Sequence, residues 1–178
     1  MKNLFFGIVL ALAASACVNL AYETPQPVNE SNLGAIPYQL QGIYLDEESD
    51  TLVVNEQGFE YRSEFSLVAD VAGLSDTLIL RQYKGCYSLN IANEDSWLVY
   101  LICRETNGDL LLYGIDVEEE AVVEKLKDIT KVITETDDSG QVTTYRINPT
   151  EEEFNRMFEE GLFEKAGRFR RIVPEDDK

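Results

Sequence analysis

Short alternating segments separated by turn residues at hairpin spacing are the feature that most limits how this chain can fold. Between Tyr38 and Ile115, runs rich in β-branched, aromatic and leucine side chains are interrupted by clusters of Gly, Asn, Asp and Ser. Runs of this kind, with an alternation of period two, predict antiparallel strands joined by short loops. We expect strands at 38–45, 51–54, 59–63, 65–71, 77–83, 85–92, 96–104 and 110–115.

The hydrophobic period changes to that of a helix after residue 115. Asp116 and Glu119 have the spacing of a capping box at the start of a segment that runs to about residue 129. Three apolar positions share one helical face: Val122, Leu126 and Ile129. The sequence therefore predicts an amphipathic helix here.

A second helix is expected after Thr150. Thr150 and Glu153 repeat the capping-box spacing, and Gly161 is well placed to end the helix. Its expected buried stripe is Phe154, Met157 and Phe158. The remaining strands are expected at 131–135, 141–147 and 167–173.

These elements predict an α+β fold that is mainly antiparallel β. We expect a strongly bent sheet or partly open barrel of about 8–11 short strands, with two amphipathic helices near the C-terminus. A single domain should span residues 38–173, with a disordered tail at 174–178.

The opening strand carries Gly42-Ile43-Tyr44, and the closing strand carries Arg168 and Arg170. Glycine inside a strand often marks a bend. This pair of features resembles the lipocalin-like (calycin) barrels, which open with a G-x-W strand and often close with a basic residue over that aromatic ring. Here tyrosine replaces the tryptophan, and a long α-β-β-α insert precedes the last strand. The resemblance implies that Arg168 or Arg170 packs over Tyr44.

Cys86 and Cys103 fall on two neighbouring expected strands. A hairpin that turns near residues 94–95 places Tyr87 opposite Ile102 and Cys86 opposite Cys103. Directly opposed residues are close enough to bond, and an oxidising compartment favours a disulfide. The alternative is two buried free thiols. Redox catalysis is not expected because the chain has no C-x-x-C motif.

The N-terminus has the pattern of a cleaved export signal. Lys2 precedes an apolar run at 4–14, which is shorter than the roughly 20 residues a membrane-spanning helix needs. The following Ala14-Ser15-Ala16-Cys17 resembles the lipobox of bacterial lipoproteins, although that family usually has leucine at the position of Ala14. The alternative is ordinary secretory cleavage after Ala16.

The resemblance to lipoproteins implies that residues 1–16 are a signal peptide and that Cys17 is acylated as the first mature residue. Val18, rather than aspartate, implies the outer membrane within the cell envelope. Residues 17–37 contain three prolines and few large apolar side chains, so they predict a flexible tether. We expect a small lipoprotein held to the membrane through lipid on Cys17.

Charge narrows the classes of partner. The chain of 178 residues has 33 acidic and 15 basic side chains, a net charge of −18, and no histidine. An acidic chain repels phosphate backbones, so nucleic acid is not an expected partner. The acidic surface either attracts a cationic protein partner or serves solubility. The lack of histidine excludes histidine-based catalysis and histidine metal ligands.

The acidic loop 46–50 contains Asp46, Glu47, Glu48 and Asp50. Several carboxylates together could bind calcium, but the D-x-D-x-D-G spacing is absent, and a charged hairpin turn is the simpler interpretation. We expect no metal and no cofactor.

The sequence favours a non-enzymatic binding or interaction module of the cell envelope, with no catalytic residue assigned. Its expected partner is a cationic protein or a small apolar ligand. The alternative is an acidic inhibitor or immunity-type protein that neutralises a basic envelope enzyme, and a carboxylate-based hydrolase ranks last.

Overall fold

The computed structural model describes residues 18–63 and 70–172, which form an α+β fold with one large, mainly antiparallel sheet. The strands are β1 (Asn19–Tyr22), β2 (Gly42–Leu45), β3 (Thr51–Val54), β4 (Gly58–Arg62), β5 (Asp70–Gly73), β6 (Leu78–Tyr83), β7 (Cys86–Asn93), β8 (Ser96–Arg104), β9 (Leu110–Gly114), β10 (Val132–Thr136), β11 (Val142–Ile147) and β12 (Glu164–Ile172). The helices are α2 (Glu120–Ile129) and α3 (Glu151–Glu159). The predicted fold class is confirmed. The predicted signal peptide, Cys17, most of the strand expected at 65–71, and the predicted tail lie outside the described residues.

The strands follow the order β10-β11-β1-β8-β9-β12-β2-β3-β4-β5, and the β6–β7 hairpin adds to the other edge of β8. Every pairing between these strands is antiparallel except that of β1 with β11. The end strands β10 and β5 do not pair with each other. The described sheet is therefore open.

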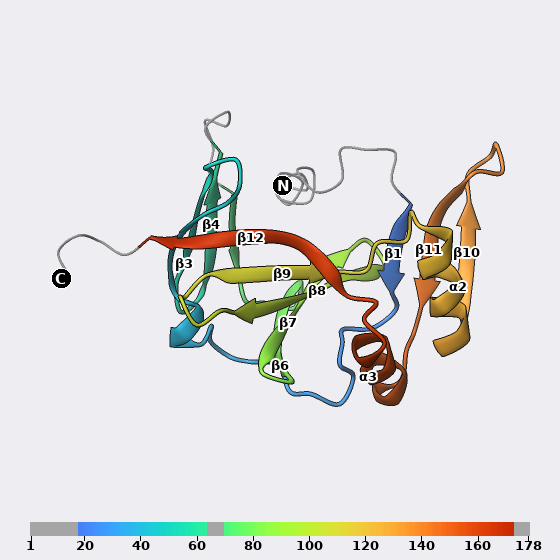
Figure 1. Cartoon of the computed structure of the whole chain (residues 1–178), viewed down its shortest axis with the longest axis horizontal. Coiled ribbons are helices and arrows are strands. Elements are labelled where there is room, and N and C mark those ends of the chain that lie inside the picture. Colours follow the sequence, from blue (N-terminus) through green and yellow to red (C-terminus); the bar gives the residue numbers. More distant parts are fainter. Residues whose placement is uncertain (1–17, 64–69, 173–178) are drawn as a thin grey trace.

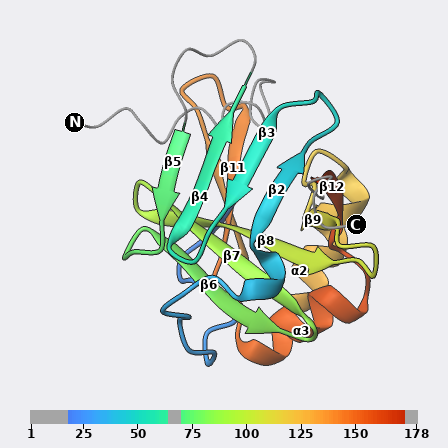
Figure 2. The ribbon, with the colours of Figure 1, turned by 90° about the vertical axis from the view of Figure 1, so that its left-hand side faces the viewer.

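β12 makes the bend that divides the sheet into two layers. Its first part pairs with β9, and its last residues, from Arg170 to Ile172, pair with β2. A register shift between Lys165 and Gly167 marks a bulge, which lets the strand curve. Figure 1 shows β12 running along β9 toward the upright β3 and β4, and Figure 2 shows β2–β5 standing over β6–β8.

The two helices cover one face of the sheet at the end away from β2–β5 (Figure 1). Phe154 and Met157 of α3 and Leu126 of α2 are fully buried there. They share a core with Val99 and Leu101 of β8. Because side chains alternate along a strand, the next β8 residues, Tyr100 and Ile102, point to the opposite face, where they line the cavity described below.

The two helix starts differ from each other. The capping box of α3 is present: the Thr150 hydroxyl accepts from the Glu153 amide, and the Glu153 carboxylate accepts from the Thr150 amide. The capping box predicted at Asp116 is wrong. Asp116 accepts from the Glu118 amide instead, in a turn that buries Val117, and α2 begins only at Glu120.

The prediction of a flexible tether at 17–37 is wrong for the described residues from 18 onward. β1 pairs with β11 along its whole length and with β8 at Tyr22, which is 1% exposed. The proline-rich stretch that follows is held by polar side chains of the sheet. Arg81 donates to the carbonyls of Pro25 and Pro27 at 2.7 Å each, and buried Asn90 bonds both backbone groups of Gln26. The proline-rich stretch has a composition typical of linkers, but it is ordered because its backbone groups are hydrogen-bonded to side chains of the sheet.

The cysteine hairpin has the predicted register. Tyr87 lies opposite Ile102, the turn falls between Asn93 and Ser96, and Cys86 and Cys103 are joined in a disulfide with a Cα–Cα distance of 4.4 Å. The disulfide closes the open end of the β7–β8 hairpin.

The expected strand at 38–45 begins later than predicted, because Tyr38–Leu40 is a 3-10 turn (η1) and β2 starts at Gly42. A basic residue of the closing strand does lie over the Tyr44 ring, as the calycin resemblance implies. It is Arg171, at 5.9 Å from the ring centre, and not Arg168 or Arg170. The Arg171 guanidinium also lies beside Gly42: a Cβ added at Gly42 would be 3.3 Å from it. The glycine therefore leaves room for this side chain.

Candidate functional site: an apolar cavity between the two layers

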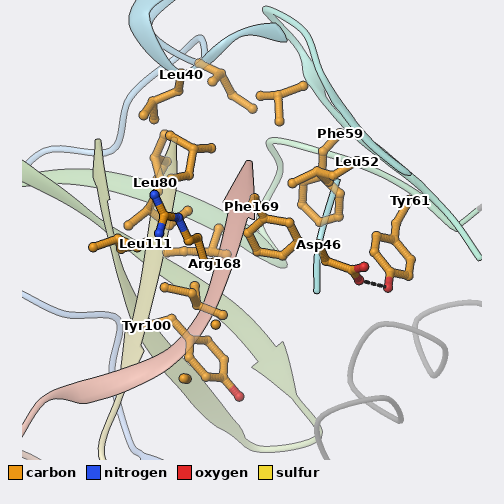
Figure 3. Close-up of a pocket in the computed structure, with 18 of the residues that line it drawn as sticks. Leu40, Asp46, Leu52, Phe59, Tyr61, Leu80, Tyr100, Leu111, Arg168 and Phe169 are labelled. Carbon is orange, nitrogen blue, oxygen red and sulfur yellow. Dashed lines mark hydrogen bonds between the residues drawn. The ribbon is translucent and has the colours of Figure 1, made fainter. Parts of the chain in front are cut away.

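A cavity of about 290 Å³ separates the inner faces of the two layers. One wall comes from β3 and β4, the other from β6–β9, and β12 runs along the side. The wall is built from leucine, isoleucine, valine and phenylalanine: Ile36, Leu40, Leu52, Val54, Phe59, Leu74, Leu78, Leu80, Leu89, Ile91, Ile102, Leu110, Leu111, Leu112 and Phe169. Figure 3 shows Leu52 and Phe59 on one side of this space, facing Phe169 and Leu80.

Strand alternation explains why the walls are apolar. Leu52 and Val54 are two residues apart on β3, and they pair with Tyr61 and Phe59 of β4, so all four project from the same face. The intervening Val53 pairs with Glu60 on the outer face. On the other layer, Leu80 pairs with Leu89 of β7 in the same way.

Members of two hydrophobic clusters line the cavity. Tyr44, Leu40 and Leu80 belong to one cluster, and Leu78 and Ile91 belong to the other. Protein interiors are normally filled to crystal-like density. The cavity is therefore space that the side chains of the described residues leave open.

One side of the rim is the acidic loop between β2 and β3, which contributes Asp46, Glu47 and Glu48 to the lining. The Tyr61 hydroxyl donates to Asp46 at 2.6 Å and to Asp50 at 3.1 Å, and the first of these bonds is drawn in Figure 3. Burial, followed by these two carboxylates, raises the pKa of Tyr61, so the hydroxyl stays a donor. Tyr61 thereby holds the acidic loop against the cavity wall.

The facing side of the rim carries Arg168 of β12, and Lys165 lies just outside the lining. The Arg168 guanidinium lies 2.7 Å from Asp109 and 3.0 Å from Glu105. The pKa of Asp109 is lowered, first by the backbone amide of Arg171 and then by Arg168. Lys165 lies 3.7 Å from Glu47 of the acidic loop. This last ion pair links the two sides of the rim.

A second hollow, of about 320 Å³, adjoins the cavity and shares Tyr100 and Ala166 with it. Its lining begins at Val18 and includes Tyr22. The Tyr22 hydroxyl is buried with no hydrogen-bond partner among the described residues, and burial raises the pKa of Tyr22. The lining is more polar than that of the cavity, because Asp116, Glu118, Glu164 and Lys165 contribute to it.

Two features singled out from the sequence, the acidic loop and the cysteine pair, lie beside the cavity. The loop considered for calcium is a hairpin turn, in which Asp46 accepts from the amides of Glu48 and Asp50. Within residues 18–63 and 70–172, no group of three acidic or cysteine side chains could hold a metal ion. The Cys86–Cys103 disulfide adjoins the wall, because Ile102 lines the cavity.

The cavity itself was not predicted from the sequence. The available signal was that Leu52, Val54 and Phe59 are apolar on one face of strands β3 and β4, which need a partner layer to cover them. Which layer covers them depends on the bend of β12; Gly167 marks a place where that strand can bend, but no local pattern says which layers the bend brings together.

Comparisons of the chain with protein-family models, with curated proteins and with solved structures found no match. Among the described helices, none has the length and apolar character required to cross a membrane.

Proposed function

We propose that this protein is a non-enzymatic binding protein that holds a small apolar ligand in the cavity between its two layers. The observation that carries the proposal is the continuous aliphatic and aromatic wall around a space of about 290 Å³. Ligand pockets in proteins are typically about 300–1,000 Å³ and mostly apolar, so this one suits a small ligand. An engineered apolar cavity of about 150 Å³ already binds benzene.

The polar groups are placed as a binding site needs them. Asp46, Glu47 and Arg168 lie at the rim, whereas the wall between the layers is apolar. Burial of an apolar ligand contributes about 0.8 kcal/mol for each CH₂ group removed from water. The wall therefore supplies affinity, and the rim supplies selection among ligands.

We further propose that the protein is a lipoprotein of the cell envelope, attached to the outer membrane through lipid on Cys17. The support is the lipobox-like sequence at 14–17. Only Val18 separates Cys17 from the first strand, which begins at Asn19. An acylated Cys17 would therefore hold the folded domain at the membrane surface. Replacement of Cys17 by alanine should release the protein from membranes, and unchanged membrane association would contradict lipidation.

Ligand binding can be tested with N-phenyl-1-naphthylamine, an uncharged apolar dye whose fluorescence rises on burial. Val54→Trp places a large side chain in the cavity, whereas Val71→Trp places the same side chain on the outer face, where Val71 is 65% exposed. We expect the original protein and Val71→Trp to bind the dye and Val54→Trp to lose most binding. Equal binding by both variants, with cooperative unfolding retained, would refute the cavity as the site.

A further inference from the structure

The charge of the rim is the feature that most restricts the ligand. The acidic loop places three consecutive carboxylates at the cavity, those of Asp46, Glu47 and Glu48. Glu47 and Glu48 are exposed, so their charges face the solvent through which a ligand enters. The apolar wall and the acidic rim occur at the same opening.

The basic residues of the rim are already committed to carboxylates. Arg168 is held by Asp109, whose side chain is 6% exposed, and also by Glu105. Lys165 is the only cation within ion-pairing distance of the acidic loop among the described residues, and its distance from Glu47 is 3.7 Å. Asp46 receives hydrogen bonds from Tyr61 and from two amides, but none of these donors carries a charge.

The described part of the rim therefore keeps an excess of negative charge after every ion pair is counted. Glu48 has no ion pair among the described residues, and the charge of Asp46 is not neutralised. A ligand whose tail fills the cavity must leave its head group beside these carboxylates. A carboxylate head would be repelled there, and an ammonium head would be attracted.

We propose that the cavity selects amphiphiles with a cationic head group on an apolar tail, over fatty acids of the same length. This inference rests on the proposed function, since it concerns the same cavity. The tail supplies the main affinity in the apolar wall, and the rim loop 46–48 sets the preference among head groups.

The test compares three ligands with the same ten-carbon chain: decylammonium, decanol and decanoate. Each displaces N-phenyl-1-naphthylamine from the purified protein at neutral pH, where the amine is protonated and the acid ionised. We expect decylammonium to bind roughly tenfold more tightly than decanoate at low ionic strength, with decanol between them, because each exposed charge contact changes affinity only a few-fold. Added salt should shrink the difference.

A pair of double variants separates the rim from the overall negative charge. Glu47→Gln/Glu48→Gln removes two rim charges, whereas Glu120→Gln/Glu152→Gln removes two exposed charges from the helices. We expect the rim variant to lose most of the preference for decylammonium and the helix variant to keep it.

The outcomes distinguish the two proposals. Tail binding without any head-group preference, or an equal loss of preference in both double variants, would overturn the inference and leave the apolar cavity as the binding site. Failure of the dye and of all three ligands to bind would overturn both.

Discussion

Asp109 is the side chain whose loss should most weaken the junction between the two layers. It lies in the turn between β8 and β9 and is 4% exposed. One carboxylate oxygen accepts from the Arg171 amide at 2.8 Å, and the other accepts from Arg168 at 2.7 Å and from Asn107 at 3.0 Å. These bonds tie the turn to β12 where β12 leaves β9 for β2.

Asp109→Ala should lower the free energy of unfolding by about 1.5–3 kcal/mol. The Arg171 amide would lose its acceptor, and an unmet buried donor costs about 1–3 kcal/mol. The hydrogen bond that is lost has a charged acceptor, and such bonds contribute about 1.5–3 kcal/mol. The two values describe the loss of the same bond, so they are not summed. Asn107 would also lose its bond to the carboxylate.

The matched control is Glu105→Gln. Glu105 bonds the same guanidinium as Asp109, but its side chain is 36% exposed, so water and salt screen the pair. Urea unfolding at neutral pH, followed by far-ultraviolet circular dichroism, would measure both variants. If Asp109→Ala and Glu105→Gln have the same midpoint and slope, the turn does not hold β12 as argued.

Three further predictions concern the pH dependence of Asp109, the disulfide, and a close contact between two strands. Folding lowers the pKa of Asp109, so the contribution of this carboxylate to stability is full above its unfolded pKa of about 3.9 and is lost as the pH falls through the folded pKa. In Asp109→Asn, the free energy of unfolding should therefore depend less on pH below about pH 4 than in the original protein. Replacing Cys86 and Cys103 by serine removes a disulfide that closes a loop with a sequence separation of 17. The midpoint of urea unfolding should fall by an amount that corresponds to about 3 kcal/mol. The double variant should be as stable as the original protein in its reduced form; stability equal to that of the oxidised protein would contradict the prediction. A Cβ at Gly58 would overlap the backbone carbonyl oxygen of Ala72 in β5, so Gly58→Ala should lower the melting temperature. Gly34 has open space around it, so Gly34→Ala should not. Equal melting temperatures of the two variants would contradict the close strand contact.

The hairpins could be read from the sequence because their determinants are local. Within β7–β8, the turn after Asn93 and the alternation on either side set the register that brings Cys86 to Cys103. The Thr150–Glu153 capping box was also predictable, since both partners lie within one helical turn. Asp116 shows the limit of such patterns, because a nearby amide at Glu118 competed for the same carboxylate.

The candidate site could not be predicted, because its parts meet only through long-range packing. β1 has four residues and no hairpin partner, and it joins β11 through parallel pairing across most of the chain. The cavity needs both Leu52 on β3 and Leu80 on β6, whose layers are brought together by the bulge in β12. The acidic loop was identified from the sequence, but its place at the rim follows from the bond between Tyr61 and Asp46.

The position of β1 has a consequence for how the molecule is made. Its four residues are synthesised before those of every other described strand, yet their main partner strand, β11, ends only at Ile147. β1 must therefore wait, with the aromatic ring of Tyr22 not yet covered by β11, until most of the polypeptide has been synthesised. During that interval it is a natural binding site for a chaperone, and a protein shortened before β11 would keep that exposed strand permanently.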